Sequence, residues 1–107
     1  MTEKFAHIHN HSEFSMLDGL SSIELYVRET KRLGQDAVAI TDHGNMHAVI
    51  ELHNQAKAAG IHPIMGCEFY ATPFGTGYDN KDRKANHMLV LAQNQVGYQN
   101  MLVLTKN

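Results

Sequence analysis

Short apolar runs alternate along this chain with segments whose apolar residues recur every three or four positions. An apolar run bounded by turn residues is typical of a strand, and the wider spacing is typical of an amphipathic helix. The sequence therefore predicts strands at residues 5–9, 37–41, 63–71 and 87–92. Helices are expected in between and after the last strand, with an exposed loop at 72–85. This order predicts an α/β fold with parallel strands and right-handed crossovers.

The expected helices carry recognisable end signals. Ser21 followed by Glu24 fits a capping box at the start of the first helix. The second helix is expected over residues 46–59, with Gly60 as its stop. Asn94 is expected to cap the last helix, which continues toward the C-terminus.

Charge, hydropathy and cysteine content narrow the class of protein. The formal net charge is -2 and no run of Lys or Arg is present, so the sequence holds no basic arm for nucleic acid. No apolar stretch is long enough to span a membrane, and the first residues lack the apolar core of a signal peptide. The single cysteine, Cys67, cannot form an internal disulfide, which is typical of proteins in a reducing cytoplasm.

The histidines form the most distinctive local pattern. The chain has eight, and His7, His9 and His11 are spaced by two, which turns their side chains to one side of an extended chain. Clustered imidazoles repel one another when protonated, and a divalent ion relieves this, since neutral imidazole is a good ligand for zinc, manganese or iron. The pattern favours a metal site over a polar strand end with incidental histidines.

Other candidates lie near the ends of the expected strands. Asp42 and His43 directly follow the second strand, at the end where catalytic groups gather in α/β folds. One of the pair is expected to bind a metal while the other orients it. Asp18 lies in a turn before the first helix, where the role of a turn residue competes with that of a ligand.

Glu68 lies late in the third expected strand. Alternation places Cys67 on the opposite face, toward a helix, while Gly66 leaves room for a bulky occupant beside the carboxylate. With histidines on neighbouring strand ends, Glu68 is expected to bridge metals. His87 begins the fourth expected strand, the wrong end in a parallel sheet, so geometry alone makes it a weak candidate. No chemistry is assigned to the remaining histidines, His47, His53 and His62.

Several segments together resemble the successive motifs of PHP domains, the polymerase and histidinol phosphatase family. They are residues 9–12 (HNHS), 15–19 (SMLDG), 41–44 (TDHG) and 60–68 (GIHPIMGCE). A further segment, 94–101 (NQVGYQNM), is similar to the Gly-Tyr-x-Asn-Leu stretch of bacterial DNA polymerase III alpha subunits. Met101 stands there in place of leucine, a volume-conserving change. The resemblance covers essentially the whole chain.

The resemblance implies a distorted (β/α)7 barrel with parallel strands, of which residues 1–107 would be the N-terminal portion, since a PHP domain is much longer. It also implies a cluster of up to three divalent ions, zinc or manganese. By similarity, the ligands are His9, His11, Asp18, His43, Glu68 and His87. His7 matches a position outside the principal ligands, and Glu68 and Asp42 are the candidate catalytic residues.

The activity implied is metal-dependent phosphoester hydrolysis, which in DNA-directed DNA polymerases that keep the ligands removes nucleotides from a DNA 3′ end. The implied partners are DNA, the remaining polymerase domains and other replisome subunits, in the cytoplasm and without a membrane. The isolated portion is expected to be inactive. Two alternatives remain open: a stand-alone PHP phosphatase such as a histidinol phosphatase, and a non-catalytic module that binds replisome partners.

Overall fold

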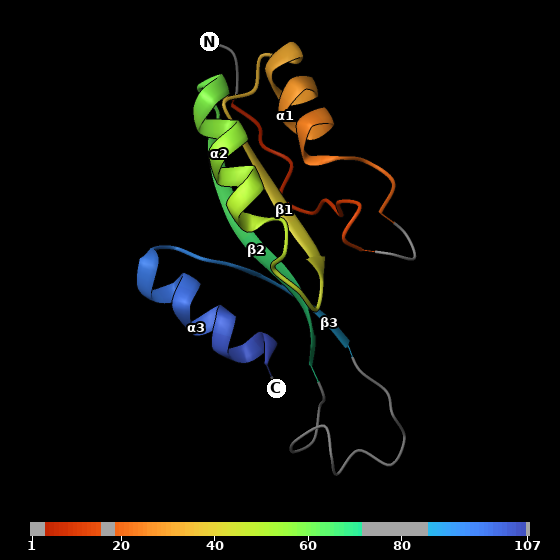
Figure 1. Ribbon diagram of the computed structural model, residues 1–107, viewed down its shortest axis with the longest axis vertical. Coiled ribbons are helices and arrows are strands. Elements are labelled where there is room, and N and C mark those ends of the chain that lie inside the picture. Colours follow the sequence, from red (N-terminus) through yellow and green to blue (C-terminus); the bar gives the residue numbers. More distant parts are fainter. Residues whose placement is uncertain (1–3, 16–18, 72–85, 107) are drawn as a thin grey trace.

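The computed structural model describes residues 4–15, 19–71 and 86–106 (Figure 1). In chain order it contains α1 (Ile23–Arg32), β1 (Ala37–His43), α2 (Val49–Ala59), β2 (His62–Ala71), β3 (Asn86–Leu91) and α3 (Gln95–Thr105). None of the helices in these ranges has the length and hydropathy needed to cross a lipid bilayer. The loop expected at 72–85 lies outside the described residues.

The strands form one mixed sheet in the order β1-β2-β3. β1 and β2 are parallel and joined through α2, as expected. β3 is antiparallel to β2, so the expectation of an all-parallel sheet is wrong at this strand. Parallel neighbours need a crossover, usually a helix, whereas antiparallel neighbours can be joined by a loop, and the sequence between β2 and β3 has no helical pattern.

The strand expected at residues 5–9 is not a regular strand in the structure. This N-terminal segment lies beside β1 and accepts hydrogen bonds from it at only two backbone carbonyls: Ala39 N donates to His7 O over 3.1 Å, and Thr41 N to Asn10 O over 2.8 Å. The side-chain amide of Asn10 donates a hydrogen bond to the carbonyl of Ala39 over 2.9 Å. A side chain therefore replaces part of the backbone ladder, and the segment is held without forming a full strand.

α1 and α2 pack side by side on the sheet and enclose the main core. The residue that caps the N-terminus of α1 is Ser22, whose hydroxyl accepts from Leu25 N over 3.2 Å. The expected cap was Ser21. α2 begins at Val49, later than expected, and ends as expected at Gly60, which adopts φ 74°. The core consists of Ile23, Val27, Val38, Ile40, Ala48, Leu52, Ala56 and Ile61. This apolar contact fixes β1 and β2, the strands that carry much of the site.

α3 lies apart from the other helices, alongside β2 (Figure 1). Asn94 caps it as expected, because its side-chain oxygen accepts from Gly97 N over 3.0 Å. Met101 is buried in a second cluster with Met46, Val49 and Cys67. This cluster holds the β1–α2 connection against β2.

Candidate metal centre

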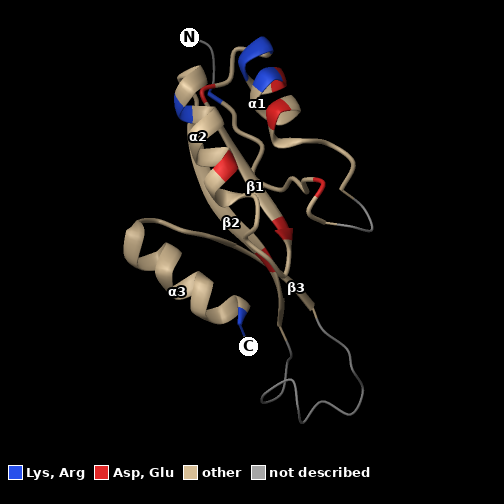
Figure 2. Ribbon diagram, viewed as in Figure 1, with Lys and Arg blue, Asp and Glu red and all other residues tan. Residues whose placement is uncertain are grey.

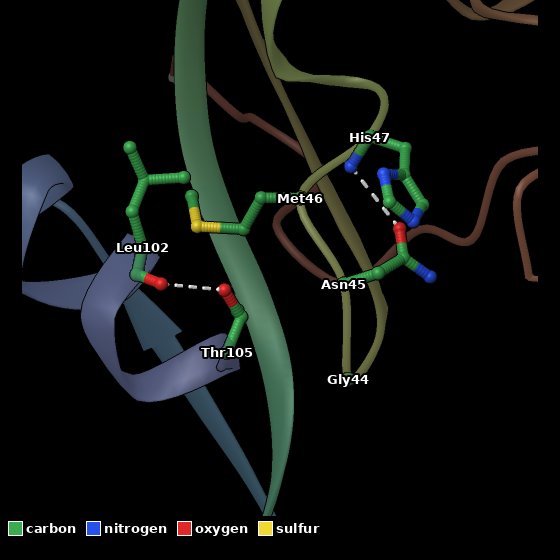
Figure 3. Close-up of a pocket in the computed structure, with 6 residues that line it drawn as sticks. All are labelled: Gly44, Asn45, Met46, His47, Leu102 and Thr105. Carbon is green, nitrogen blue, oxygen red and sulfur yellow. Dashed lines mark hydrogen bonds between the residues drawn. The ribbon is translucent and has the colours of Figure 1, made fainter. Parts of the chain in front are cut away.

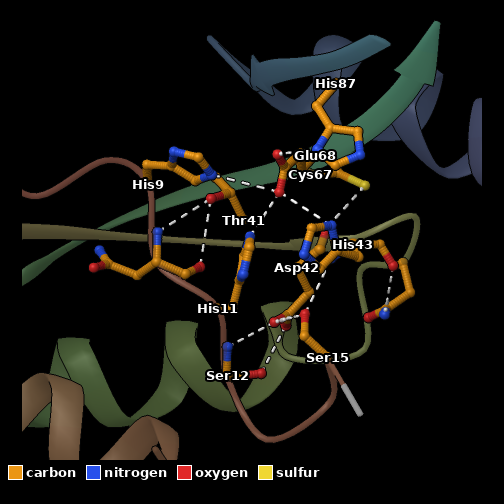
Figure 4. A network of polar contacts seen from close by, with 12 residues as sticks. His9, His11, Ser12, Ser15, Thr41, Asp42, His43, Cys67, Glu68 and His87 are labelled. Atoms are coloured by element: carbon orange, nitrogen blue, oxygen red, sulfur yellow. Dashed lines mark hydrogen bonds and ion pairs between the residues drawn. The ribbon is translucent and has the colours of Figure 1, made fainter. Parts of the chain in front are cut away.

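Four imidazoles from three segments of the sequence surround one carboxylate at the end of the sheet (Figure 4). His9 and His11 come from the N-terminal segment, and His43 is the last residue of β1. Glu68 lies in β2, and His87 lies near the start of β3. The convergence expected for these five residues at a common rim is therefore present.

The Glu68 carboxylate is the centre of this arrangement. Its Oε2 atom lies 2.6 Å from His11 Nε2, 3.1 Å from His43 Nδ1 and 3.4 Å from His9 Nε2. Its Oε1 atom lies 3.1 Å from His87 Nδ1. The two oxygens thus face different histidines, as a carboxylate that bridges two ions would.

The donor atoms fall into two groups that share Glu68. One contains His9, His11 and Glu68, the other His43, Glu68 and His87, and within each group the donor atoms lie within 4.8 Å of one another. Ligands about 2.1 Å from an ion in tetrahedral geometry stand about 3.4 Å apart. His9 and Glu68 already have this separation, whereas His11 and Glu68 are hydrogen-bonded at 2.6 Å and would move apart to hold an ion. Imidazole nitrogen with carboxylate oxygen is a donor set that zinc and manganese accept.

Glu68 is 4% exposed, yet it is held in its charged form. Burial raises its pKa, but hydrogen bonds from His11 and His9 and the nearby His43 imidazole outweigh burial, so the pKa lies below the ordinary value. A buried carboxylate that stays ionised is available as a ligand at neutral pH. Figure 2 shows acidic residues at the end of β1 and in β2, while the Lys and Arg residues of the described part lie on the helices and near the chain ends.

The antiparallel strand explains why His87 reaches the site. β3 runs opposite to β2, so its first residues lie beside the last residues of β2, and His87 pairs with Tyr70. The geometric objection to His87 assumed a parallel strand and is wrong. The expectation from resemblance and the structure agree on its place.

The residues around Glu68 follow the expected alternation, with one difference. Cys67 is fully buried on the opposite face, in the cluster with α3, and burial raises the pKa of its thiol to about 11. At Gly66, a Cβ would lie 2.7 Å from Leu91 Cδ2 and 2.8 Å from Thr41 Cγ2. The space beside this glycine is thus filled by neighbouring strands, and it does not make room for a ligand.

Asp42 lies next to the cluster, but its carboxylate is turned to other partners. It is 1% exposed and accepts from Ser12 N over 2.6 Å, Ser12 Oγ over 2.7 Å and Ser15 Oγ over 2.8 Å. The two serines were not singled out by the sequence reasoning, although both lie in the quoted motifs. His43, the other member of the pair, faces Glu68. The two members of the pair thus contact different partners in the structure.

Other predicted or considered residues are accounted for as follows. Asp18 lies outside the described residues, so its role stays a prediction. His7 is exposed, and its ring contacts Phe5 with centroids 4.8 Å apart. The groups of possible metal ligands found in the described ranges contain neither His7 nor the three histidines without assigned chemistry, His47, His53 and His62.

A pocket of about 230 Å³ lies beside the cluster, between the β1–α2 connection and α3 (Figure 3). Its lining residues are Gly44, Asn45, Met46, His47, Leu102 and Thr105. None of the residues around Glu68 lines it, so it is separate from the candidate metal centre.

Comparisons with known proteins agree with this picture. The model of the PHP domain family matches residues 7–107. The chain is 44% identical over 104 residues to the DNA polymerase III subunit alpha of Treponema pallidum, covering 94% of the chain and 9% of the relative. It is 39% identical over 102 residues to that of Chlamydia pneumoniae, covering 92% of the chain and 8% of the relative. The chain thus spans about a tenth of the curated relatives it matches.

Solved structures show the same fold. A protein from Bifidobacterium adolescentis assigned to the metal-dependent phosphoesterases aligns with a TM-score of 0.65 at 24% identity, covering 92% of this chain and 32% of that one. An amidohydrolase from Chromobacterium violaceum aligns with a TM-score of 0.63 at 19% identity, with the same coverage of both chains. The α/β arrangement with a small mixed sheet therefore matches part of larger known structures.

Proposed function

Since the chain belongs to the PHP domain family, we propose that residues 1–107 are the N-terminal portion of the PHP domain of a bacterial DNA polymerase III alpha subunit. The complete domain is proposed to be a distorted (β/α)7 barrel. Its site hydrolyses phosphodiester bonds at a DNA 3′ end with the help of divalent ions. The identity with polymerase III alpha subunits from several bacteria supports the choice of parent.

One observation carries the proposed chemistry: four imidazoles converge on one buried carboxylate. Without an ion, this arrangement leaves Glu68 in contact with more histidines than a single carboxylate needs for its charge. A site with two groups of donors that share a carboxylate is typical of paired divalent ions.

The residues divide the work as follows. His9 and His11 would hold one ion, His43 and His87 would hold another, and Glu68, which belongs to both groups of donors, is the proposed shared ligand and catalytic carboxylate. Asp18 is proposed as a further ligand by resemblance. Zinc and manganese fit this donor set, with up to three ions in the complete domain. When bound, such ions lower the pKa of water and neutralise charge on phosphate.

The charge of the chain bears on how DNA would reach the site. With a net charge of -2, the described surface offers no extended basic track for DNA. DNA is therefore proposed to reach the site through phosphate contacts made by the rest of the polymerase. The proposed setting is the bacterial cytoplasm, with the other polymerase domains and replisome subunits as partners.

The test uses the full-length protein. Bound zinc and manganese are measured by elemental analysis, and nucleotide release is measured on 3′-labelled single-stranded DNA. The wild type is expected to hold metal and to shorten the DNA, and Glu68→Gln is expected to lose both properties. Glu51→Gln, the same change at an exposed position on α2, is the matched control and should retain both.

Three outcomes would each overturn a part of the proposal. Hydrolysis of a phosphomonoester without action on DNA would favour a stand-alone phosphatase. Absence of bound metal from the wild type would favour a non-catalytic binding module. Failure of the full-length protein to extend a DNA primer would exclude the polymerase parent.

A further inference from the structure

We propose that Asp42 is a positioning residue that joins the two histidine groups of the metal centre, rather than a ligand or a residue that touches the substrate. This inference rests on the proposed function, since it concerns the geometry of the same site. It goes beyond it by assigning a role to a hydrogen-bond network formed by Asp42, Ser12 and Ser15, named here the Asp42 network (Figure 4).

Both oxygens of the Asp42 carboxylate accept hydrogen bonds from within the protein. Oδ1 accepts from Ser12 N and from Ser15 Oγ, and Oδ2 accepts from Ser12 Oγ, all over 2.6 to 2.8 Å. Ser12 is 0% exposed and Ser15 is 3% exposed. A buried carboxylate is costly unless donors compensate its charge, and three short, charge-assisted bonds do so. Three of its roughly four lone-pair positions are thus used inside the protein, and Asp42 is 1% exposed, so its carboxylate is poorly placed to bind an ion.

The donors come from the segment that carries His11, and the acceptor comes from the strand that carries His43. Ser12 directly follows His11, and Asp42 directly precedes His43. Ser15 Oγ also accepts a hydrogen bond from His43 N over 3.1 Å. The network therefore ties both histidine backbones to one carboxylate, and it sets the separation of the His11 and His43 rings, whose centroids lie 4.0 Å apart.

The N-terminal segment needs such a tie because the sheet holds it weakly. In residues 4–10 its backbone bonds to β1 at two places: Ala39 N donates to His7 O, and Thr41 pairs with Asn10 through its N–H and its hydroxyl. Tyr26 OH donates to His11 O over 2.7 Å and adds a contact from α1, but this contact does not reach β1. Ordering a free backbone has an entropic cost, so a segment ordered in advance by Asp42 binds an ion more tightly than a loose one.

The test measures cobalt(II) binding to the 107-residue chain, because the visible absorption of cobalt reports the geometry of its ligands. The variants are Asp42→Ala, which removes the network, and Asp42→Asn, which keeps an acceptor at the same place. Ser15→Ala removes two bonds of the network. Thr30→Ala is the matched control. Thr30 is a buried residue of α1 whose hydroxyl donates to Tyr26 O over 2.7 Å, and it takes no part in the Asp42 network.

A positioning role predicts a graded result. Asp42→Ala and Ser15→Ala should weaken cobalt affinity about 10- to 100-fold, as loss of a partner that orients metal ligands does, and should change the absorption spectrum. Asp42→Asn should restore most of the affinity, and Thr30→Ala should leave affinity and spectrum unchanged. If Asp42 binds the ion directly, Asp42→Asn will lose as much affinity as Asp42→Ala, and the inference is overturned. Unchanged binding in Ser15→Ala overturns it as well.

A measurement without metal separates this inference from the proposed function. In the wild type, nuclear Overhauser contacts between the His11 and His43 rings are expected, and Ser15→Ala should lose them while Thr30→Ala keeps them. If the wild type binds no cobalt but this ring contact depends on Ser15, the proposed function fails and the positioning role stands. If cobalt binds and the ring contact survives in Ser15→Ala, the positioning role fails alone. Circular dichroism would reveal whether Asp42→Ala folds. If it does not, Ser15→Ala and Asp42→Asn are used for both the cobalt titration and the ring-contact measurement.

Discussion

His87 Nδ1 lies 3.1 Å from Glu68 Oε1, although the two residues belong to strands that run in opposite directions. The register pairs Glu68 with Leu89 and His87 with Tyr70, so the two side chains are diagonal neighbours on one face of the sheet. This relationship depends on the antiparallel pairing, because a parallel β3 would carry His87 to the opposite end of β2.

The first prediction tests that placement. His87→Ala should weaken zinc or manganese binding more than about tenfold, equivalent to about 1.4 kcal/mol, because the group around Glu68 Oε1 loses its imidazole. The measurement is isothermal titration calorimetry. His62→Ala is the control, since His62 begins β2 at the opposite end from the site and is exposed. Equal losses in both variants would show that His87 has no special part in binding.

The second prediction concerns the tight packing of β2 at Gly66. Gly66→Ala should lower the free energy of unfolding by about 1–3 kcal/mol, because its Cβ would overlap Leu91, Thr41 and the carbonyl of Val90. Urea denaturation provides the measurement. Gly97→Ala is the control of opposite sign: a Cβ there meets neighbours only at 3.7 Å or more, and alanine should stabilise α3 by about 0.5–1 kcal/mol. A stable Gly66→Ala variant would contradict the packing.

The third prediction concerns the start of α1. Ser22→Ala should destabilise the chain by about 0.5–2 kcal/mol, because the amide of Leu25 loses its side-chain acceptor. Ser22→Asp retains an acceptor and should recover most of this loss in the same denaturation assay. If Ser22→Ala behaves like the wild type, Ser22 is not the functional cap.

The fourth prediction concerns the reactivity of Cys67. The thiol is fully buried, and its pKa is raised to about 11, so almost no thiolate is present at pH 8. In the folded chain, modification by a chromogenic disulfide reagent should be far slower than in guanidinium, where an ordinary cysteine pKa of about 8.5 applies. Rapid modification of the native protein would mean that the cluster around Cys67 opens readily.

Much of the fold follows from local patterns and was therefore predictable. The apolar run at β1 and the signals at Gly60 and Asn94 depend on neighbouring residues, and the structure agrees with them. The cap at Ser22 was missed by one position because two adjacent serines offer the same chemistry. The segment at residues 5–9 was predicted as a strand because its alternation is strand-like, but Asn10 takes part of the hydrogen bonding that a strand would need.

The amino-acid sequence by itself was enough to select most of the side chains that converge in the candidate site. His9 and His11 could be selected from their spacing by two, and His43 from its place directly after an expected strand. Glu68 could be selected because these histidines were expected on neighbouring strand ends. Only the tertiary structure decided the direction of β3, and hence the position of His87, together with the different contacts of Asp42 and His43. These depend on contacts between residues far apart in the chain, such as Ser12 with Asp42. No local pattern encodes such contacts, because they form only when the core has brought the segments together.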